Sequence, residues 1–377
     1  MMKLFSAIFC CLLLGACQQA TETGTTATTT TTLNYEHPIP YEPREYVCYQ
    51  TAQAPVIDGQ LENAVWEKVP WTVDFVDIEG DLKPKTTYRT RAKMLWDEQY
   101  FYFAAEIEEP HLWATITERD AVMYNNDDFE IFIDPDGDGQ NYYEFEMNAN
   151  NAVWDLLMLY PYRVDTMPNY LNNWDIKGIK TGVTLVGTLN DPSDTDSLWR
   201  VEIAMPWSAL KELAPEARMP KDGEQWRVNF SRVDWHMDIV EGVYKKQIDP
   251  KTGIQQKWPE ENWVWSPSGR VDMHQTETWG FVQFSNQQPS DGPVAFQKNP
   301  DEAIKWALWQ LYFQQEQHWE QHGSYTNQKS SFTLPKNVEG FSPQVATTPN
   351  QFEIMAAGVK GGIWHINERG RIWWTEQ

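Results

Sequence analysis

The stretch from Asp127 to Asn148 reads DDFEIFIDPDGDGQNYYEFEMN, two runs of alternating apolar and polar residues around a loop rich in aspartate and glycine. Successive side chains of a β-strand point to opposite faces of a sheet, so Phe129, Ile131 and Ile133 share one face of the first run. Such alternation on both sides of a turn-forming loop predicts an antiparallel hairpin with one face in a hydrophobic core.

The second run of this hairpin carries polar groups on the face that points away from the expected core. Its apolar positions are Tyr143, Phe145 and Met147, and they alternate with Tyr142, Glu144, Glu146 and Asn148. Carboxylates and amides hydrogen-bond to hydroxyl groups, and aromatic rings offer flat apolar surfaces. The hairpin therefore predicts a candidate surface for binding sugars.

The sequence from residue 45 to residue 284 is predicted to be mainly β. Further strands are indicated at residues 91–96, 100–107, 152–160, 182–189, 199–205, 226–230 and 280–284, and a strand end and glycine turn at 56–59 precede a short helix with a buried Trp66. Many short strands, few helices and no glycine-rich βαβ turn favour an antiparallel β-sandwich of two sheets.

A small α+β appendage is predicted after a polar break at residues 286–299. Asn299 and Pro300, followed by two acidic residues, are typical of a helix start, and we expect this helix to continue to about His318. Strands are expected at residues 352–357, 362–366 and 371–374. We therefore divide the folded part into a sandwich at residues 46–286 and an appendage of unknown function at residues 287–377.

Residues 1–17 have the pattern of a lipoprotein signal peptide. The apolar run from residue 4 to residue 14 is too short to cross a bilayer, and Leu14-Gly15-Ala16-Cys17 resembles the bacterial lipobox. That resemblance implies cleavage before Cys17 and lipidation of its sulfur, while a plain secretory signal with a chance cysteine is the alternative. Gln18 after the cysteine resembles the pattern for sorting to the outer membrane, so a lipid-anchored envelope protein is expected.

Residues 18–45 are expected to form a threonine-rich tether without fixed structure. Cys10 and Cys11 would leave with the signal peptide and Cys17 would carry lipid, so Cys48 would have no partner for an intramolecular disulfide. We interpret Cys48 as a small buried hydrophobe rather than a nucleophile.

Composition and motif content exclude several classes of function. A net charge of −24 over 377 residues disfavours nucleic acids and anionic membrane surfaces as partners. The sequence contains no H-E-x-x-H, G-x-S-x-G, P-loop or dinucleotide-binding motif. The 20 tryptophans must mostly fill cores, but some are free to stack on sugars.

The loop of the hairpin is a candidate metal site. Asp134, Asp136 and Asp138, followed by Gly139, match the first half of an EF-hand loop, but the position that needs a bidentate glutamate is Phe145. We favour a metal-free hairpin turn, and structural Ca2+ bound through Asp134, Asp136 and Asp138 is the alternative.

Several motifs, in order, resemble carbohydrate-binding module family 9 and its wider relatives. They are Val56-Ile57-Asp58-Gly59 with Trp66, the LWDEQYFY run at 95–102, the DFEIFID run at 128–134, and Trp279-Gly280. The resemblance covers roughly residues 46–286. It implies a β-sandwich that binds sugars without catalysis, frequent attachment to glycoside hydrolases, and structural calcium in some members.

The resemblance also implies where a sugar would bind. Members clamp a sugar between two tryptophans; the first position corresponds to Tyr124 here, and the second lies in the segment 273–280. An arginine of the family is replaced by Glu146. The chain therefore resembles the stand-alone relatives, and the altered clamp puts the family's preference for the reducing ends of plant polysaccharides in doubt for this chain.

The residues expected to bind the ligand come from the hairpin, its flanks and later strand ends: Tyr124, Asn126, Asp128, Glu144, Glu146, Asn148, Trp174, Arg232 and His274. Further stacking candidates are Trp113, Trp154, Trp235, Trp263 and Trp265. The expected function is non-catalytic binding of a glycan or oligosaccharide by a membrane-anchored lipoprotein that supports carbohydrate catabolism.

Two other functions stay open. Glu144 and Glu146 lie two residues apart on one strand face, about 7 Å between Cα atoms, and a glycoside hydrolase would use them as acid and base. Alternatively, the chain is an envelope assembly lipoprotein whose appendage docks a partner protein. A glycan-degrading enzyme is the other partner expected.

Overall fold

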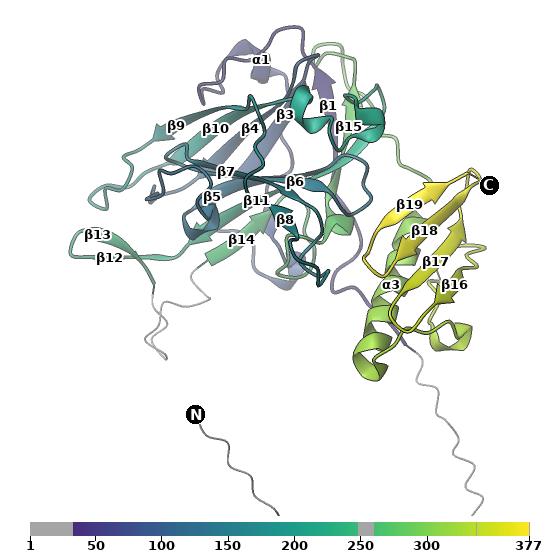
Figure 1. Ribbon diagram of the computed structural model, residues 1–377. Helices are drawn as coiled ribbons and strands as arrows, with labels where there is room; N and C mark the ends of the chain where they lie inside the picture. The colour runs from purple at the N-terminus through teal and green to yellow at the C-terminus, as the bar shows by residue number, and fades with distance from the viewer. Residues whose placement is uncertain (1–32, 248–259, 337, 377) are drawn as a thin grey trace, which may run out of the picture.

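The computed structural model describes residues 33–247, 260–336 and 338–376 (Figure 1). The expected signal peptide, Cys17 and residues 18–32 of the expected tether lie outside these residues. Residues 33–45, expected to lack fixed structure, are described, and Leu33 and Tyr35 among them are buried. Within them, no helix has both the length and the apolar character that crossing a membrane would require. Cys48 is buried, as expected.

The larger part of the chain forms one continuous, curled sheet. The strand order is β8-β7-β6-β5-β11-β15-β1-β3-β4-β10-β9, and β14 and β2 extend it beside β11. The strands are β1 (Glu45–Gln50), β2 (Val76–Asp77), β3 (Thr90–Trp96), β4 (Tyr100–Glu108), β5 (Asp128–Asp134), β6 (Tyr142–Asn148), β7 (Val153–Met158), β8 (Tyr170–Leu171), β9 (Lys180–Val186), β10 (Leu198–Pro206), β11 (Gln225–Trp235), β14 (Glu260–Val264) and β15 (Gly280–Ser285).

Strand β1 joins the two halves of this sheet. It pairs in parallel with β15 on one side and with β3 on the other, whereas the other strand pairs of the sheet are antiparallel. The expected mainly-β fold is therefore confirmed. The hydrogen bonds, however, connect the strands into a single curled sheet, and they do not divide it into two separate sheets.

The core fills the inside of the curl. Phe129, Ile131 and Ile133 of β5 belong to one buried cluster with Phe145 of β6, and side chains of β3, β4 and β10 join the same cluster. Alternate residues of both hairpin strands thus face the core, as the two-residue pattern predicts. Each of these four side chains is fully buried. The alternating residues between them therefore point to the face of the hairpin opposite the core.

Some local predictions were wrong. Residues 56–57 form no strand, and Val56 is 67% exposed. The glycine turn is present, since Gly59 has φ +84°, and Trp66 is fully buried in α1 (Ala64–Glu67). Two short strands, β12 (Met237–Val240) and β13 (Val243–Lys246), form a separate ribbon that the sequence pattern did not indicate.

The C-terminal part contains one long helix and a second sheet (Figure 1). Helix α3 (Glu302–His322) starts after Asp301 and ends at His322 rather than near His318. It packs on β17 and β18 of a four-stranded antiparallel sheet. The strands are β16 (Gln344–Thr347), β17 (Phe352–Ala357), β18 (Ile363–Asn367) and β19 (Ile372–Thr375).

A buried ion pair joins α3 to the large sheet. Arg227 of β11 lies 2.7 Å from Glu302 of α3 and also donates to the carbonyl of Trp279 at 2.6 Å. Lys305 lies 3.2 Å from the same glutamate. The C-terminal part is therefore attached to the sheet by charge as well as by apolar contact.

We expect Arg227→Met to lower the free energy of unfolding by about 3 kcal/mol, because it leaves Glu302, only 18% exposed, with Lys305 as its one remaining ion-pair partner among the described residues. Chemical denaturation measures this change. Lys298→Met is the matched control, since Lys298 is 81% exposed in its ion pair with Glu45 and such pairs contribute about 0–1 kcal/mol. Equal effects of the two substitutions would contradict the role of the buried pair.

Candidate functional site

A row of side chains crosses four strands on the face opposite the core. Glu146 of β6 pairs with Glu130 of β5 on one side and with Trp154 of β7 on the other, and Glu130 pairs with Ser231 of β11. Paired residues of neighbouring strands point to the same face. The register therefore places two glutamates and a tryptophan side by side.

A cavity of about 310 Å³ opens on this face. Its walls come from β5, β6, β7, β11 and β14, from the short helix η2 (Met123–Asn125), from Ile78 and from the loop at residues 271–274. Its aromatic and polar lining residues include Tyr124, Glu130, Glu144, Glu146, Trp154, Asn262, Asp272 and His274. Its volume is at the lower end of the range for small-molecule sites, roughly 300–1,000 Å³.

Two aromatic rings flank the cavity. Tyr124 is 48% exposed and Trp154 is buried, and their ring centroids lie 6.5 Å apart at an interplanar angle of 39°. The Tyr124 amide donates to Glu146 at 3.1 Å, and the Tyr124 carbonyl accepts from the indole of Trp235 at 2.9 Å. The backbone of Tyr124 is thus held in place beside the carboxylates while its ring reaches solvent.

The carboxyl groups beside these rings are deeply buried. Asp128, Glu130, Glu144 and Glu146 are 0–5% exposed, and one oxygen from each of Asp128, Glu130 and Glu146 lies within 4.8 Å of the others. Burial, reinforced for three of them by the charge of Glu130, raises the pKa of each. The floor of the cavity therefore favours protons or other cations.

His274 does not balance this charge. Its Nδ1 shares a 2.6 Å hydrogen bond with the Tyr142 hydroxyl, and its Nε2 lies 4.0 Å from Glu144. Burial lowers the pKa of His274 to about 4, so the imidazole is neutral at pH 7 and forms no ion pair there. As a neutral ring it remains able to hydrogen-bond to a ligand hydroxyl.

Four of the expected ligand-binding residues thus meet at the cavity: Tyr124, Glu144, Glu146 and His274. Sequence reasoning missed Glu130 and ranked Trp154 only among secondary stacking candidates. The signal for Glu130 was present, because it alternates with the apolar residues of β5 and therefore shares the outer face with Glu146.

Asn126 and Asn148 are buried and do not line the cavity. The Asn126 side-chain Oδ1 accepts from the backbone amides of Thr115 and Ile116, at 2.8 Å each, and from the Asn148 side-chain amide at 3.1 Å. Both amides therefore hold the segment that precedes β5. Asp128, the next candidate along the chain, does not line the cavity. It lies close to Glu130 and Glu146, and we call these three residues the acidic set.

Trp174 lies away from the cavity. Its ring stacks on Tyr143 with centroids 5.0 Å apart, and Tyr143 belongs to the core. This corrects the prediction that Trp174 contacts a ligand in the cavity, because its ring packs against the opposite face of the hairpin.

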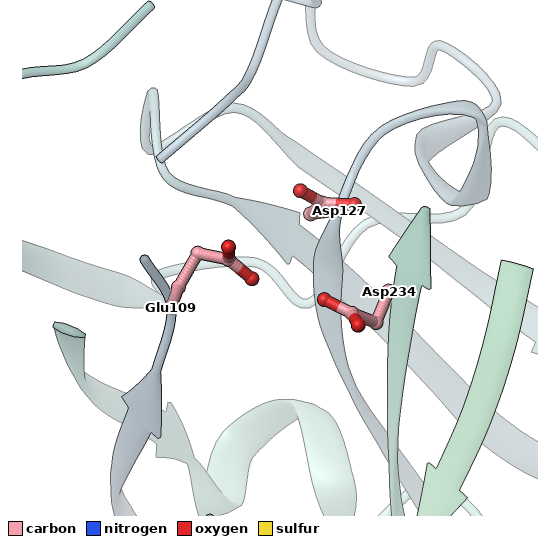
Figure 2. Close-up of side chains that lie close together, drawn as sticks. All are labelled: Glu109, Asp127 and Asp234. Atoms are coloured by element: carbon pink, nitrogen blue, oxygen red, sulfur yellow. The ribbon is translucent and has the colours of Figure 1, made fainter. Parts of the chain in front are cut away.

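Arg232 is also removed from the cavity. It is 1% exposed and forms ion pairs with Glu109 and with Asp234, the latter at 2.7 Å. Figure 2 shows Glu109, Asp127 and Asp234 converging from three segments. The guanidinium balances that acidic group, so it does not donate to a ligand in the cavity.

The aspartates of the hairpin loop lie close together, but the protein already uses their oxygens. Asp134 accepts from the amides of Gly137 and Gly139 at 2.9 Å each, and Asp138 lies 2.8 Å from Arg371. Gly139 has φ +85°, the left-handed region that a tight turn needs. These bonds favour the hairpin turn, and structural Ca2+ at Asp134, Asp136 and Asp138 stays a prediction.

A larger cavity, of about 590 Å³, lies where α3 meets the large sheet. The Glu302 carboxyl group in its wall is already paired, since it accepts from the Tyr41 hydroxyl at 3.0 Å and from Arg227. The Tyr41 ring stacks on Trp306 with centroids 3.9 Å apart. We therefore interpret the larger cavity as part of the contact between α3 and the large sheet, and we take the smaller cavity as the candidate site.

Residues 57–225 match the family model described as Carbohydrate family 9 binding domain-like. The sequence is 26% identical over 156 residues to the exoglucanase XynX of Acetivibrio thermocellus, covering 41% of this chain and 12% of that protein. It is 33% identical over 104 residues to endo-1,4-beta-xylanase C of Paenibacillus barcinonensis, covering 26% and 9%. The chain thus matches only about a tenth of the length of these relatives.

Two solved structures are also similar. One is a carbohydrate binding module family 9 from Caldicellulosiruptor kristjanssonii in complex with cellotriose, with a TM-score of 0.41 and 16% identity over 68% of this chain and 100% of that chain. The other is a putative carbohydrate-binding protein from Bacteroides uniformis, with a TM-score of 0.47 and 14% identity over 65% of this chain and 100% of that chain.

We expect the free energy of unfolding to fall as pH rises from 4.5 to 8 in a chelating buffer. Burial raises the pKa of Glu130 to about 7 and that of Glu144 to about 8 from 4.5. The folded state then binds protons that the unfolded chain releases, so stability is lost as pH rises through this window. Thermal melting across this pH range measures the effect.

Glu144→Gln should flatten this pH dependence, because the amide cannot ionise. Glu212→Gln is the control, since Glu212 is exposed. Parallel pH curves for the wild type and Glu144→Gln would show that Glu144 has no raised pKa.

Proposed function

We propose that the cavity beside Tyr124 and Trp154 binds carbohydrate without cleaving it, because residues 57–225 match the family model described as Carbohydrate family 9 binding domain-like. One observation carries this proposal. A solvent-exposed aromatic ring stands at the opening of a small cavity whose floor consists of buried carboxyl groups.

The two kinds of side chain serve two parts of a sugar. The rings of Tyr124 and Trp154 offer flat surfaces to the apolar face of a pyranose. Glu130, Glu144 and Glu146 hydrogen-bond to its hydroxyl groups, as acceptors when ionised and also as O–H donors when protonated. Apolar contact and oriented polar groups together give a small-molecule site its selectivity.

Oligosaccharides of β-1,4-linked xylose or glucose are the first ligands to test. The relatives that share this region are named as xylanases and an exoglucanase. We infer that the present chain binds a related glycan and supports its breakdown beside separate glycan-degrading enzymes.

Binding rather than hydrolysis is favoured by the placement of the carboxyl groups. Glu144 and Glu146 are on one strand and in one wall of the cavity. Glycosidases hold their two carboxyl groups on either side of the scissile bond. Release of reducing sugar from xylan or cellulose by the purified chain would instead support the glycoside hydrolase alternative.

We further propose that residues 46–286 form the sugar-binding domain, with two layers of strands, and that residues 287–377 form an appendage to it. Lipid on Cys17 and the tether at residues 18–45 would hold both at the outer membrane. The basis is the lipobox-like sequence before Cys17. An envelope assembly role is the alternative, and a stable co-purifying protein without glycan binding would support it.

Tyr124→Ala should weaken glycan binding about tenfold, which corresponds to about 1.4 kcal/mol, because the stacking surface is lost. Trp374→Ala is the matched control, since Trp374 of β19 is 47% exposed, as Tyr124 is 48% exposed, but does not line the cavity. A glycan array followed by calorimetry with the full-length chain provides the measurement. Unchanged affinity of Tyr124→Ala for a glycan that the wild type binds would remove the cavity from the proposal.

Cys17→Ala should shift the protein from the membrane fraction to the soluble fraction of the cell envelope, because the anchor would be lost. Fractionation followed by immunoblotting detects the shift. Cys48→Ala is the control, since Cys48 is buried in the core and should leave the distribution unchanged. Membrane retention of Cys17→Ala would contradict lipid anchoring at this residue.

A further inference from the structure

The acidic set, Asp128, Glu130 and Glu146, brings three carboxyl groups together on one face of the sheet. Asp128 and Glu130 lie two residues apart on β5, and Glu146 lies directly opposite Glu130 on β6. Like charges in directly opposed positions destabilise a sheet. All three side chains are at least 95% buried, so water does little to reduce this repulsion.

The other acidic groups in the described part of the chain contain an arginine. Arg232 lies among Glu109, Asp127 and Asp234, which are labelled in Figure 2. Likewise, Arg119 pairs with the group Asp120, Asp155 and Asp175, and Arg371 pairs with the group Asp134, Asp136 and Asp138. Among the described residues, no lysine or arginine nitrogen lies within 4.0 Å of Asp128, Glu130 or Glu146.

Two buried oxygens in this region have no hydrogen-bond partner among the described residues. Asp128 uses one oxygen to accept from the amide of Val233 at 3.2 Å, and its second oxygen has none. One oxygen of Glu144, a residue that lines the cavity, also lacks a hydrogen-bond partner. Leaving a carboxylate oxygen buried and unpaired costs free energy that a bound cation would recover.

The geometry suits a hard divalent cation. Calcium binds oxygen ligands at 2.3–2.6 Å, so two oxygens on opposite sides of one ion lie about 5 Å apart. Oxygens of Asp128, Glu130 and Glu146 that lie within 4.8 Å of one another match this requirement. Glu130 and Glu146 also line the cavity, which gives an ion a path to enter and leaves coordination positions for water or ligand hydroxyls.

We propose that Asp128, Glu130 and Glu146 bind a divalent cation of the calcium type in the floor of the cavity, and that this ion takes part in glycan binding. The second half of this statement rests on the function proposed above. The ion would supply the positive charge that arginine supplies in the other three acidic groups, and its open positions would accept sugar hydroxyl oxygens.

Calcium alone is the first probe. After treatment with chelator, calorimetric titration of the full-length chain with calcium chloride should show saturable uptake, and calcium should raise the melting temperature. Glu130→Gln should weaken uptake at least tenfold. It should still fold, because it removes one of two opposed charges, and its melting temperature without calcium should be at or above that of the wild type.

Asp175→Asn is the matched control, because Asp175 belongs to the acidic group that Arg119 already neutralises. Its calcium uptake should equal that of the wild type. Absence of uptake by the wild type, or uptake that Glu130→Gln leaves intact, would overturn the proposed ion site.

The glycan measurement separates the two proposals. If chelator abolishes glycan binding and calcium restores it in the wild type, the ion takes part as proposed. If glycan binding is equal with chelator and with calcium, the participation of the ion is overturned while the carbohydrate function stands. If calcium binds but no glycan does, the carbohydrate function is overturned while the ion site stands.

Discussion

The register between β5 and β6 is the constraint on which both the core and the candidate site depend. Because side chains alternate, one set of backbone hydrogen bonds sends Ile131 and Phe145 into the core and brings Glu130 opposite Glu146 on the other face. A shift of one residue would bury the acids in the core and expose the apolar set. The burial of the apolar residues fixes this register, and the register keeps Glu130 and Glu146 opposite each other although their like charges repel.

The hairpin shows how far sequence reasoning reaches. Its two faces, its loop and the mainly-β fold were predictable, because period-two alternation is a local property. Trp174 and Arg232 were misplaced because their partners, Tyr143 and Glu109, are brought to them by the curl of the sheet, which local pattern does not specify. Asn126 and Asn148 could not be separated from cavity residues, since a polar side chain that holds backbone looks the same in sequence as one that meets a ligand.

The acidic character of the chain acquires a more specific meaning in the structure. A net charge of −24 suggested only which partners to exclude. In the fold, much of that charge is gathered into small groups in which an arginine offsets the repulsion, as Arg371 does beside Asp138. The set beneath the cavity departs from this arrangement, and it does so beside the exposed ring of Tyr124. The acidic side chains without an arginine partner and the exposed aromatic ring thus lie at the same cavity.

The parallel pairing of β1 has a consequence for how the molecule reaches its native state. Glu45, at the start of β1, is paired in register with Phe281 of β15, the last strand of the large sheet along the chain, and β1 also pairs with β3. Contacts between such distant parts of a chain form slowly, because a long loop must close before they contribute. Strand β1 cannot form its pairs with β15 until β15 has been synthesised, so the large sheet stays incomplete until most of the chain has been made.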